Sequence, residues 1–423
     1  MNRKTHNFLA WVIWLLSASF MFYKYAIEVS PSVMTTHLMS EFNIDGAQLG
    51  NLAACYFYAY LLMQIPAGLL VDRFGPRRVT SIAIAICGLG TILFATSNSL
   101  LLAQIGRFAA GFGAAFAALN CLKLTANWFP SNRFAFMAGL MMTLGMLGAV
   151  GGQAPLSAFI NTLGWRDALF IIGIAGLGLG FIFWLVVRDR SKYHIDVNLA
   201  PEDTNIWKSC LAVFKSKQSW FLSVYSGLAF APITVFGGLW GVPFIAEAFE
   251  LSKTHAANII SLLFIGFAVG APFWGWFSDF VGNRKKMMYL GTIFATIAFS
   301  LVIYLPLSIW FLSLTMFLFG FFISSFLLCF TMIREINAPI VAGTAIGFMN
   351  AFDALLGALS DPLTGKFLDL GWDGTMTAGA RVFSVETYRW ALTTVPIYLL
   401  VATALLFFIK ETYCKSVYPS PMP

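Results

Sequence analysis

Long apolar segments alternate with short polar ones along the whole chain. The apolar segments lie near residues 10–34, 48–71, 78–97, 101–126, 134–158, 166–187, 220–245, 257–279, 287–306, 309–333, 341–364 and 387–410. Each has about 20 residues or more, which is enough to cross the roughly 30 Å hydrocarbon core of a bilayer as an α-helix. The pattern therefore predicts an all-α membrane protein with twelve transmembrane helices.

The amino-acid composition is also that expected of a protein embedded in lipid. Hydrophobic residues make up 59% of the sequence and charged residues 11%, whereas soluble domains carry about 25% charged residues. The sequence has no basic stripe interleaved with aromatic residues, so we expect no binding to nucleic acid. The six cysteines form no C-x-x-C pair and the four histidines are scattered, so we expect no metal, no cofactor and no enzymatic activity.

Basic residues lie mostly in the polar segments on one side of the predicted membrane. Lysine and arginine are enriched in cytoplasmic loops, so we assign this side to the cytoplasm. An even number of spans then places both termini there. Arg3 and Lys4 precede the first apolar segment, but that segment is longer than the apolar core of a signal peptide, so we expect a retained first helix.

The order of segments predicts two halves. The longest polar stretch, 188–219, separates six apolar segments from the next six, so we expect a first bundle at 1–187, a linker at 188–219 and a second bundle at 220–423. The sequence after the second segment, G-L-L-V-D-R-F-G-P-R-R, is repeated in weaker form after the eighth as G-W-F-S-D-F-V-G-N-R-K-K. Asp72 and Asp279 occupy equivalent positions, which indicates an internal repeat.

The pattern G-x-L-x-D-R-x-G-x-R-R resembles the signature of the major facilitator superfamily. The R-x-x-x-G at 107–111, W-F-P at 128–130 and G-W-R at 164–166 are also similar to elements of that family. The resemblance covers the whole chain and implies two pseudo-symmetric six-helix bundles that transport a solute by alternating access. It also implies a monomer, multi-pass in the lipid bilayer of a bacterial inner membrane.

The repeated loop is expected to hold a gate on the cytoplasmic side. By resemblance, the charged cluster latches that side shut in the outward-facing state; the alternative is a basic loop with structural glycines. Phe280 stands where the first copy has Arg73, so the second latch is expected to be weaker. The predicted gating residues are Asp72, Arg73, Arg77, Asp279 and Arg284.

Two charges in the first span are candidates for transport, because a charge within the bilayer is costly. Lys24 and Glu28 are four residues apart and share one helix face. They form either a self-neutralising structural bridge or a functional pair. In the second case Lys24 binds an anionic group of the solute and Glu28 takes the coupling proton.

Further candidates lie in the fourth and eleventh spans. Arg107 is assigned to proton coupling or to helix packing, and Lys123 to the cavity or to the membrane interface. Asn350 and Asp353 share a helix face with Asp361. We expect Asp353 to carry a proton or to pair with a cation, and Asp361-Pro362 to end a helical segment.

Polar and aromatic side chains complete the predicted substrate site. Tyrosine and glutamine can donate and accept hydrogen bonds to a polar solute, although aromatic residues are also common in any membrane helix. These candidates are Tyr25, Tyr56, Tyr60, Gln64, Gln153 and Trp240.

The function expected from these features is proton-coupled symport of a small anionic or zwitterionic solute, an organic acid or an amino acid. The first span, the loop signature and residues 347–350 look most similar to proteobacterial anion symporters and intraphagosomal amino-acid transporters. No ATP-binding loop G-x-x-x-x-G-K-[ST] is present, so a gradient of H⁺ or Na⁺ is the expected energy source. The rivals are a proton-driven exporter of a drug, metabolite or siderophore, and a non-transporting sensor, which the short termini disfavour.

Overall fold

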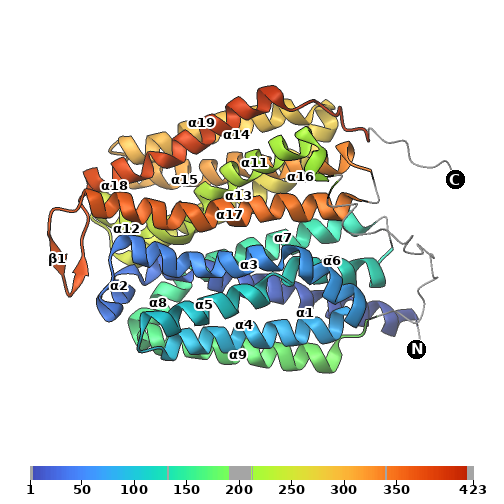
Figure 1. Cartoon of the computed structure of the whole chain (residues 1–423), viewed down its shortest axis with the longest axis horizontal. Helices are drawn as coiled ribbons and strands as arrows, with labels where there is room; N and C mark the ends of the chain where they lie inside the picture. The colour runs from blue at the N-terminus through green and yellow to red at the C-terminus, as the bar shows by residue number, and fades with distance from the viewer. Residues whose placement is uncertain (1–2, 131–132, 190–210, 212, 339–340, 417–423) are drawn as a thin grey trace.

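The helices run along one common direction and form two bundles in the computed structural model (Figure 1). The structure describes residues 3–130, 133–189, 211, 213–338 and 341–416. The first bundle contains α1 (Arg3–Val29), η1 (Ser30–Val33), α2 (Thr35–Phe42), α3 (Gly46–Phe74), α4 (Pro76–Thr96), α5 (Leu100–Ala114), α6 (Ala117–Trp128), α7 (Phe134–Gly151), α8 (Ala154–Leu163) and α9 (Trp165–Val186).

The second bundle begins after the predicted linker. It contains α11 (Lys217–Pro232), η3 (Ile233–Trp240), α12 (Gly241–Ala248), α13 (Lys253–Val281), α14 (Arg284–Tyr304), α15 (Ile309–Ile323), η4 (Ser324–Leu327), α16 (Leu328–Ile336), α17 (Ala342–Leu370), α18 (Val385–Leu392), α19 (Thr394–Leu405) and η6 (Leu406–Phe408). A small antiparallel hairpin, β1 (Met376–Thr377) with β2 (Ala380–Arg381), follows α17. Most of the predicted linker 188–219 lies outside the described residues.

The number of spans agrees with the hydrophobic pattern. Among the described residues, 11 helical stretches are long and apolar enough to cross a membrane, and there are 12 if the two parts of α3 form one span. The parts of α3 meet at a 58° bend between Gln64 and Pro66, because proline lacks the N–H that the helix needs there. The prediction of an all-α membrane protein with two six-helix bundles is confirmed.

Several spans contain a stretch that is not α-helical. The first changes from α-helix to the 3₁₀ turn η1 at Ser30-Pro31, and the seventh contains the π-helical stretch η3, a form often found at functional sites. The prediction that Asp361-Pro362 ends a helical segment is wrong, because α17 continues through Pro362 to Leu370. Proline is tolerated inside membrane helices, where neighbouring groups satisfy the freed carbonyl.

The two ends of the molecule are formed by different elements. The start of α1 and residues 409–416 lie at one end, which we call the terminus end. The hairpin with α2, α8, α12 and α18 lies at the other, which we call the hairpin end (Figure 1). Side-chain caps begin two of the helices that start from the hairpin end. Asp45 and Gln48 form a capping box on α3, and Ser252 caps α13.

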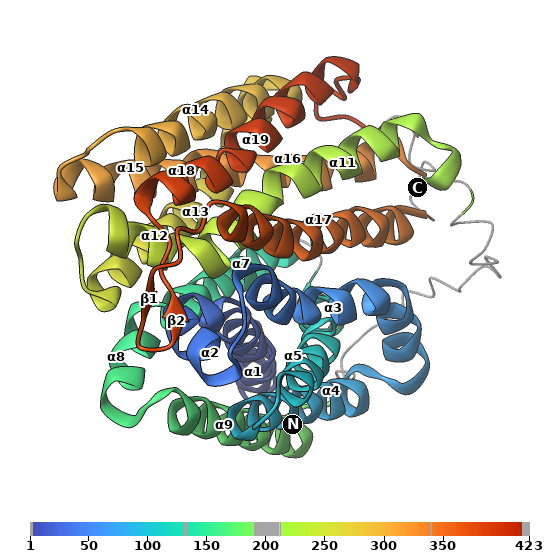
Figure 2. The same ribbon diagram turned by 60° about the vertical axis from the view of Figure 1, so that its left-hand side comes forward.

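The bundles meet along two helix pairs, α3 with α17 and α7 with α13. Figure 2 shows α3 and α17 facing one another across the junction. Glycines bring these two backbones together near the hairpin end. A Cβ on Gly50 would lie 2.4 Å from the carbonyl oxygen of Asp361, and one on Gly365 would lie 2.1 Å from that of Gly46. Only glycine permits this approach.

Candidate functional site

A cavity of about 480 Å³ lies between the two bundles, within the usual size of a small-molecule site. Its walls come from α1, α3, α6, α7, α11, η3, α13, η4, α16 and α17. Glu28, Gly238 and Asp361 line it at mid-bundle. From there it extends toward the terminus end, where Gly139 and Thr331 line it.

Lys24 and Glu28 face this cavity from the last two turns of α1. Lys24 Nζ lies 2.6 Å from Glu28 Oε2, and the two side chains are each only 6% exposed. The ammonium also lies 3.7 Å from the centre of the Tyr25 ring and 5.0 Å from that of Tyr60, close enough for cation–π attraction. The structure thus brings together four predicted residues around one buried charge pair.

Arg107 lies behind this pair and does not line the cavity. Its guanidinium donates to the carbonyls of Ile27 at 2.9 Å, Glu28 at 3.4 Å and Ala53 at 3.5 Å. The first two carbonyls belong to the last turn of α1, where a cation is favourable to the helix dipole. Arg107 therefore holds the backbone that carries Glu28, and it is itself 1% exposed.

The second bundle contributes two buried carboxyl groups, both from α17. Asp353 Oδ1 accepts a hydrogen bond of 2.6 Å from Ser226 Oγ, and Asn350 lines the cavity one turn away. Asp361, two turns further on, was predicted only as a helix end. Its position on the face shared with Asn350 and Asp353 was the sequence signal that could have identified it.

Other predicted substrate residues lie away from the cavity. Gln153 donates to the carbonyl of Gly237 at 2.7 Å and accepts from Ser32 at 3.1 Å, so it links the bundles. Tyr56 is fully buried beside Arg107, with its hydroxyl 3.4 Å from the carbonyl of Lys24. Trp240 is buried in the second bundle. Gln64 is likewise outside the residues that line the cavity.

The first copy of the loop motif is held by local contacts. Asp72 forms an ion pair with Lys123, the remaining substrate candidate, and both side chains are substantially exposed. The Arg77 backbone N–H donates to Asp189 at 2.6 Å, and its Nε donates to the carbonyl of Trp184 at 2.8 Å. Arg73 is exposed. These contacts keep α4 against the end of α9.

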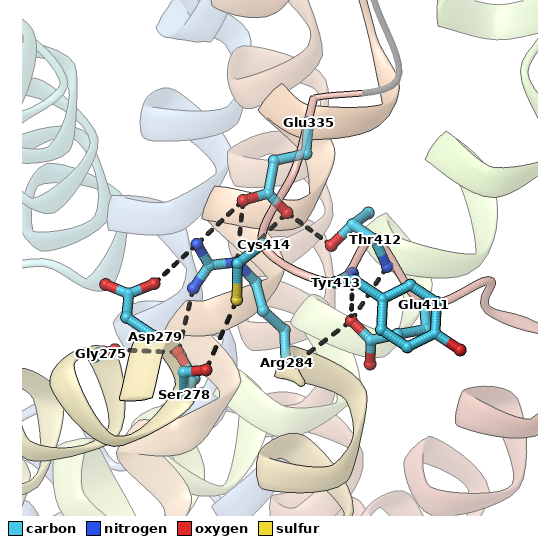
Figure 3. Close-up of polar contacts among 9 residues, drawn as sticks. All are labelled: Gly275, Ser278, Asp279, Arg284, Glu335, Glu411, Thr412, Tyr413 and Cys414. Atoms are coloured by element: carbon cyan, nitrogen blue, oxygen red, sulfur yellow. Dashed lines mark hydrogen bonds and ion pairs between the residues drawn. The ribbon is translucent and has the colours of Figure 1, made fainter. Parts of the chain in front are cut away.

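The second copy forms a denser network (Figure 3). Arg284 contacts Glu335 at 2.9 Å and Asp279 at 3.0 Å, and it donates to Ser278 Oγ at 3.0 Å. Glu411, after the last span, accepts from the backbone N–H groups of Arg284 and Lys285. Arg284 is the repeat counterpart of Arg77 and is the centre of this network. The expectation that the second latch is weaker remains a prediction.

Polar contacts join the bundles at the hairpin end. Asp369 accepts hydrogen bonds of 2.8 Å from the backbone N–H groups of Gly46 and Ala47, at the start of α3. Arg381 in β2 pairs with the same carboxylate at 2.9 Å. Thr254 at the start of α13 bonds Ser157 on α8 at 3.0 Å. The cavity is thus separated from the hairpin end by contacts between the bundles.

Two helical bundles around a central cavity with buried charges are the architecture of polytopic membrane transporters. A model of the Major Facilitator Superfamily matches residues 13–242 and 223–421, and the chain belongs to this superfamily. The superfamily is one of membrane transporters, not of enzymes.

Three curated relatives illustrate its place in the family. The uncharacterized transporter YybO of Bacillus subtilis is 34% identical over 184 residues, which span 43% of this chain and 42% of the relative. A probable hexose phosphate transport protein of Chlamydia pneumoniae is 24% identical over 87% of each chain. The membrane sensor protein UhpC of Salmonella typhimurium is 24% identical over 86% of this chain and 85% of the relative.

Solved structures agree in fold. A bacterial homolog of the human lysosomal transporter Spinster, in an inward-facing and unoccupied conformation, has a TM-score of 0.78. The likeness covers 95% of this chain and 96% of that one at 17% identity. It concerns the fold alone.

Proposed function

We propose that the protein is a proton-coupled transporter that carries a small organic anion or zwitterion by alternating access. In this proposal Lys24 binds the anionic group of the solute, and Glu28 and Asp353 carry protons. The two bundles, 1–187 and 220–423, would rock about the central cavity. A monomer suffices for this cycle, because both halves of the cavity come from one chain.

The buried pair of Lys24 and Glu28 carries the proposal. At 2.6 Å, Glu28 neutralises the only basic residue among the described residues that line the cavity. An anionic group of a solute therefore competes with Glu28 for Lys24. A proton bound to Glu28 removes that competition, because a neutral carboxyl group attracts the ammonium far less than a carboxylate does. Proton binding and anion binding then favour each other, as symport requires.

Asp353 supplies a second place for a proton, across the cavity from α1. Ser226 is its hydrogen-bond donor at 2.6 Å. Its side chain is buried, and an ionised carboxylate in that setting is costly unless a cation or proton accompanies it. We assign it to proton carriage in the second bundle.

We place both termini in the cytoplasm of a bacterial cell, on the basis of the basic loops at the terminus end. The cavity extends toward that end, so the described conformation would be inward-facing. The contacts of Asp369 and Thr254 would then close the outer side. An anionic solute is also supported by the relative from Chlamydia pneumoniae, which is named as a probable transporter of hexose phosphate, itself an anion.

The test is uptake into proteoliposomes that contain the purified protein, with a panel of organic acids and amino acids. We expect an inward proton gradient to drive accumulation. Glu28→Gln should abolish proton-driven accumulation but preserve exchange of solute between the two sides, because Lys24 is then permanently available. Lys24→Gln should weaken both by about tenfold or more, the cost of a lost charged hydrogen bond.

Glu386→Gln is the matched control, because Glu386 lies exposed in the first turn of α18. Accumulation by Glu28→Gln equal to that of wild type would reject the assigned proton site. Efflux rather than uptake under the same gradient would favour the exporter. Specific binding without any flux would favour a sensor, the role named for the relative UhpC.

A further inference from the structure

The charges around the cavity do not balance. Among the described residues that line it, the acids are Glu28, Asp353 and Asp361 and the base is Lys24. Arg107 lies behind the wall and acts electrostatically on Glu28 and Asp361. With both bases counted, one carboxylate is left over. Adding a simple anion increases this imbalance, whereas a solute that also carries an ammonium group leaves it no larger.

Asp361 is the carboxylate with an oxygen that accepts no hydrogen bond within the described residues. Glu28 has Lys24 and Asp353 has Ser226. Asp361 is 2% exposed, and its Oδ1 has no hydrogen-bond partner among the described residues although the residue lines the cavity. A buried acceptor left unpaired costs free energy, so a donor delivered through the cavity is the fitting partner.

The backbone of Asp361 is held in place from both bundles. Gly50 of α3 packs against its carbonyl oxygen, and Trp240 Nε1 donates to the same oxygen at 3.3 Å. The carboxyl group is therefore presented to the cavity at the junction of α3 and α17. A ligand bound there would contact the site where the bundles touch.

The rest of the wall indicates what else the ligand carries. Six phenylalanines line the cavity, at 57, 230, 264, 267, 326 and 330, and Met21, Met141, Met142 and Met146 add flexible apolar surface. Such a wall gains free energy by covering a large apolar group. A small, fully polar solute would leave most of it without contacts.

We propose that Asp361 binds an ammonium group of the transported solute, and that the solute is a zwitterion with a large apolar or aromatic side group. This inference rests on the proposed function, in which Lys24 receives the anionic end. It narrows that proposal, because simple organic acids and sugar phosphates have no ammonium group.

Matched compounds that differ only in charge test the inference. Binding to the purified full-length protein is measured by calorimetry with phenylalanine, 3-phenylpropionate and 2-phenylethylamine. The corresponding series from tryptophan and from leucine follow. We expect at least one zwitterion to bind about tenfold more tightly than its deaminated anion, since the ammonium adds a charged hydrogen bond. Asp361→Asn should remove this preference and leave the anion within about twofold of its wild-type affinity.

Two further variants keep the result interpretable. Asp361→Glu keeps the charge and should retain a preference for the zwitterion, and Asp373→Asn changes an exposed acid outside the cavity and should change nothing. Equal binding of anion and zwitterion by the wild type overturns the inference and leaves the role of Lys24 intact. A preference for the zwitterion that survives Asp361→Asn also overturns the inference. The same holds if no compound with an ammonium group binds. Binding of the amines alone supports Asp361 and instead contradicts the anion site at Lys24.

Discussion

The carboxylate of Asp369 lies 2.8 Å from the backbone nitrogen of Gly46, so the end of α17 caps the start of α3 in the other bundle. A carboxylate at a helix N-terminus satisfies unpaired N–H groups and interacts favourably with the helix dipole. Arg381 holds the same carboxylate from the hairpin. In the proposed alternating-access cycle this contact breaks when the hairpin end opens, so its strength should affect the conformational equilibrium.

Replacing Asp369 by Asn should weaken closure at the hairpin end. The loss of a charged cap costs about 1–2 kcal/mol, which changes the ratio of the two conformations by about five- to thirtyfold. The readout is alkylation of a cysteine at Thr143, which lines the cavity, by a membrane-impermeant maleimide added from the hairpin side. The labelling rate should rise by that factor in a background without reactive native cysteines.

The control for this measurement is Asp373→Asn. Asp373 lies in the same connection, but its side chain bonds within its own turn, to the N–H of Thr375 at 2.9 Å. Its replacement should leave labelling unchanged. A labelling rate in Asp369→Asn equal to that of the control would mean that the cap does not contribute to closure.

Gly50→Ala should disfavour the same closed state through sterics. The added Cβ would lie 2.4 Å from the carbonyl oxygen of Asp361 and 2.6 Å from Pro362 Cα. Forcing an atom into such a contact costs about 1–3 kcal/mol, so transport should slow by about tenfold or more. Gly178→Ala is the matched control, because nothing lies within 4 Å of a Cβ there. Equal transport rates in the two variants would contradict the close approach of α3 and α17.

Arg107→Lys should destabilise the protein although it keeps the charge. A lysine ammonium cannot reproduce the planar fork that reaches the carbonyls of Ile27, Glu28 and Ala53. Each buried acceptor left unpaired costs about 1–3 kcal/mol. The midpoint of thermal unfolding of the purified protein should fall by several degrees. A variant that unfolds at the wild-type temperature would show that Arg107 is not needed to hold the end of α1.

Arg284 has one exposed and one buried acidic partner, so the contributions of the two ion pairs to stability can be compared. Asp279 is 64% exposed and Glu335 only 12% exposed in their ion pairs with Arg284. Exposed pairs contribute about 0–1 kcal/mol, whereas breaking a buried pair costs about 3–5 kcal/mol. Glu335→Gln should therefore lower the unfolding midpoint much more than Asp279→Asn does. The reverse order, measured in one buffer, would reject the burial argument.

The fold was largely predictable because the bilayer permits few solutions. Backbone groups within lipid must be paired inside each segment, so apolar length alone located the spans. Hydrophobicity could not locate the interruptions, such as the π-helical stretch at Ile233–Trp240. These depend on packing between helices, as does the unbroken course of α17 through Pro362.

The candidate site was only partly predictable, since helical spacing gives a face but not the depth of a residue or its partner. Lys24, Glu28 and Asp353 face the cavity as their positions in the spans suggested. Gln153 has the same polar character, but a break between α7 and α8 turns it toward the carbonyl of Gly237. Asp361 was overlooked because the following proline favoured a helix end over a functional carboxyl group.

The surplus carboxylate in the cavity has a consequence for the response to membrane voltage. If a zwitterion and one proton occupy the site, the loaded transporter is electrically neutral, and the empty transporter returns with one negative charge. An elementary charge that crosses the full potential changes the free energy by about 2.3 kcal/mol per 100 mV. Voltage should therefore alter net uptake, which requires the empty return, and leave solute exchange unaffected. Currents recorded with proteoliposomes on a solid support would separate the two steps.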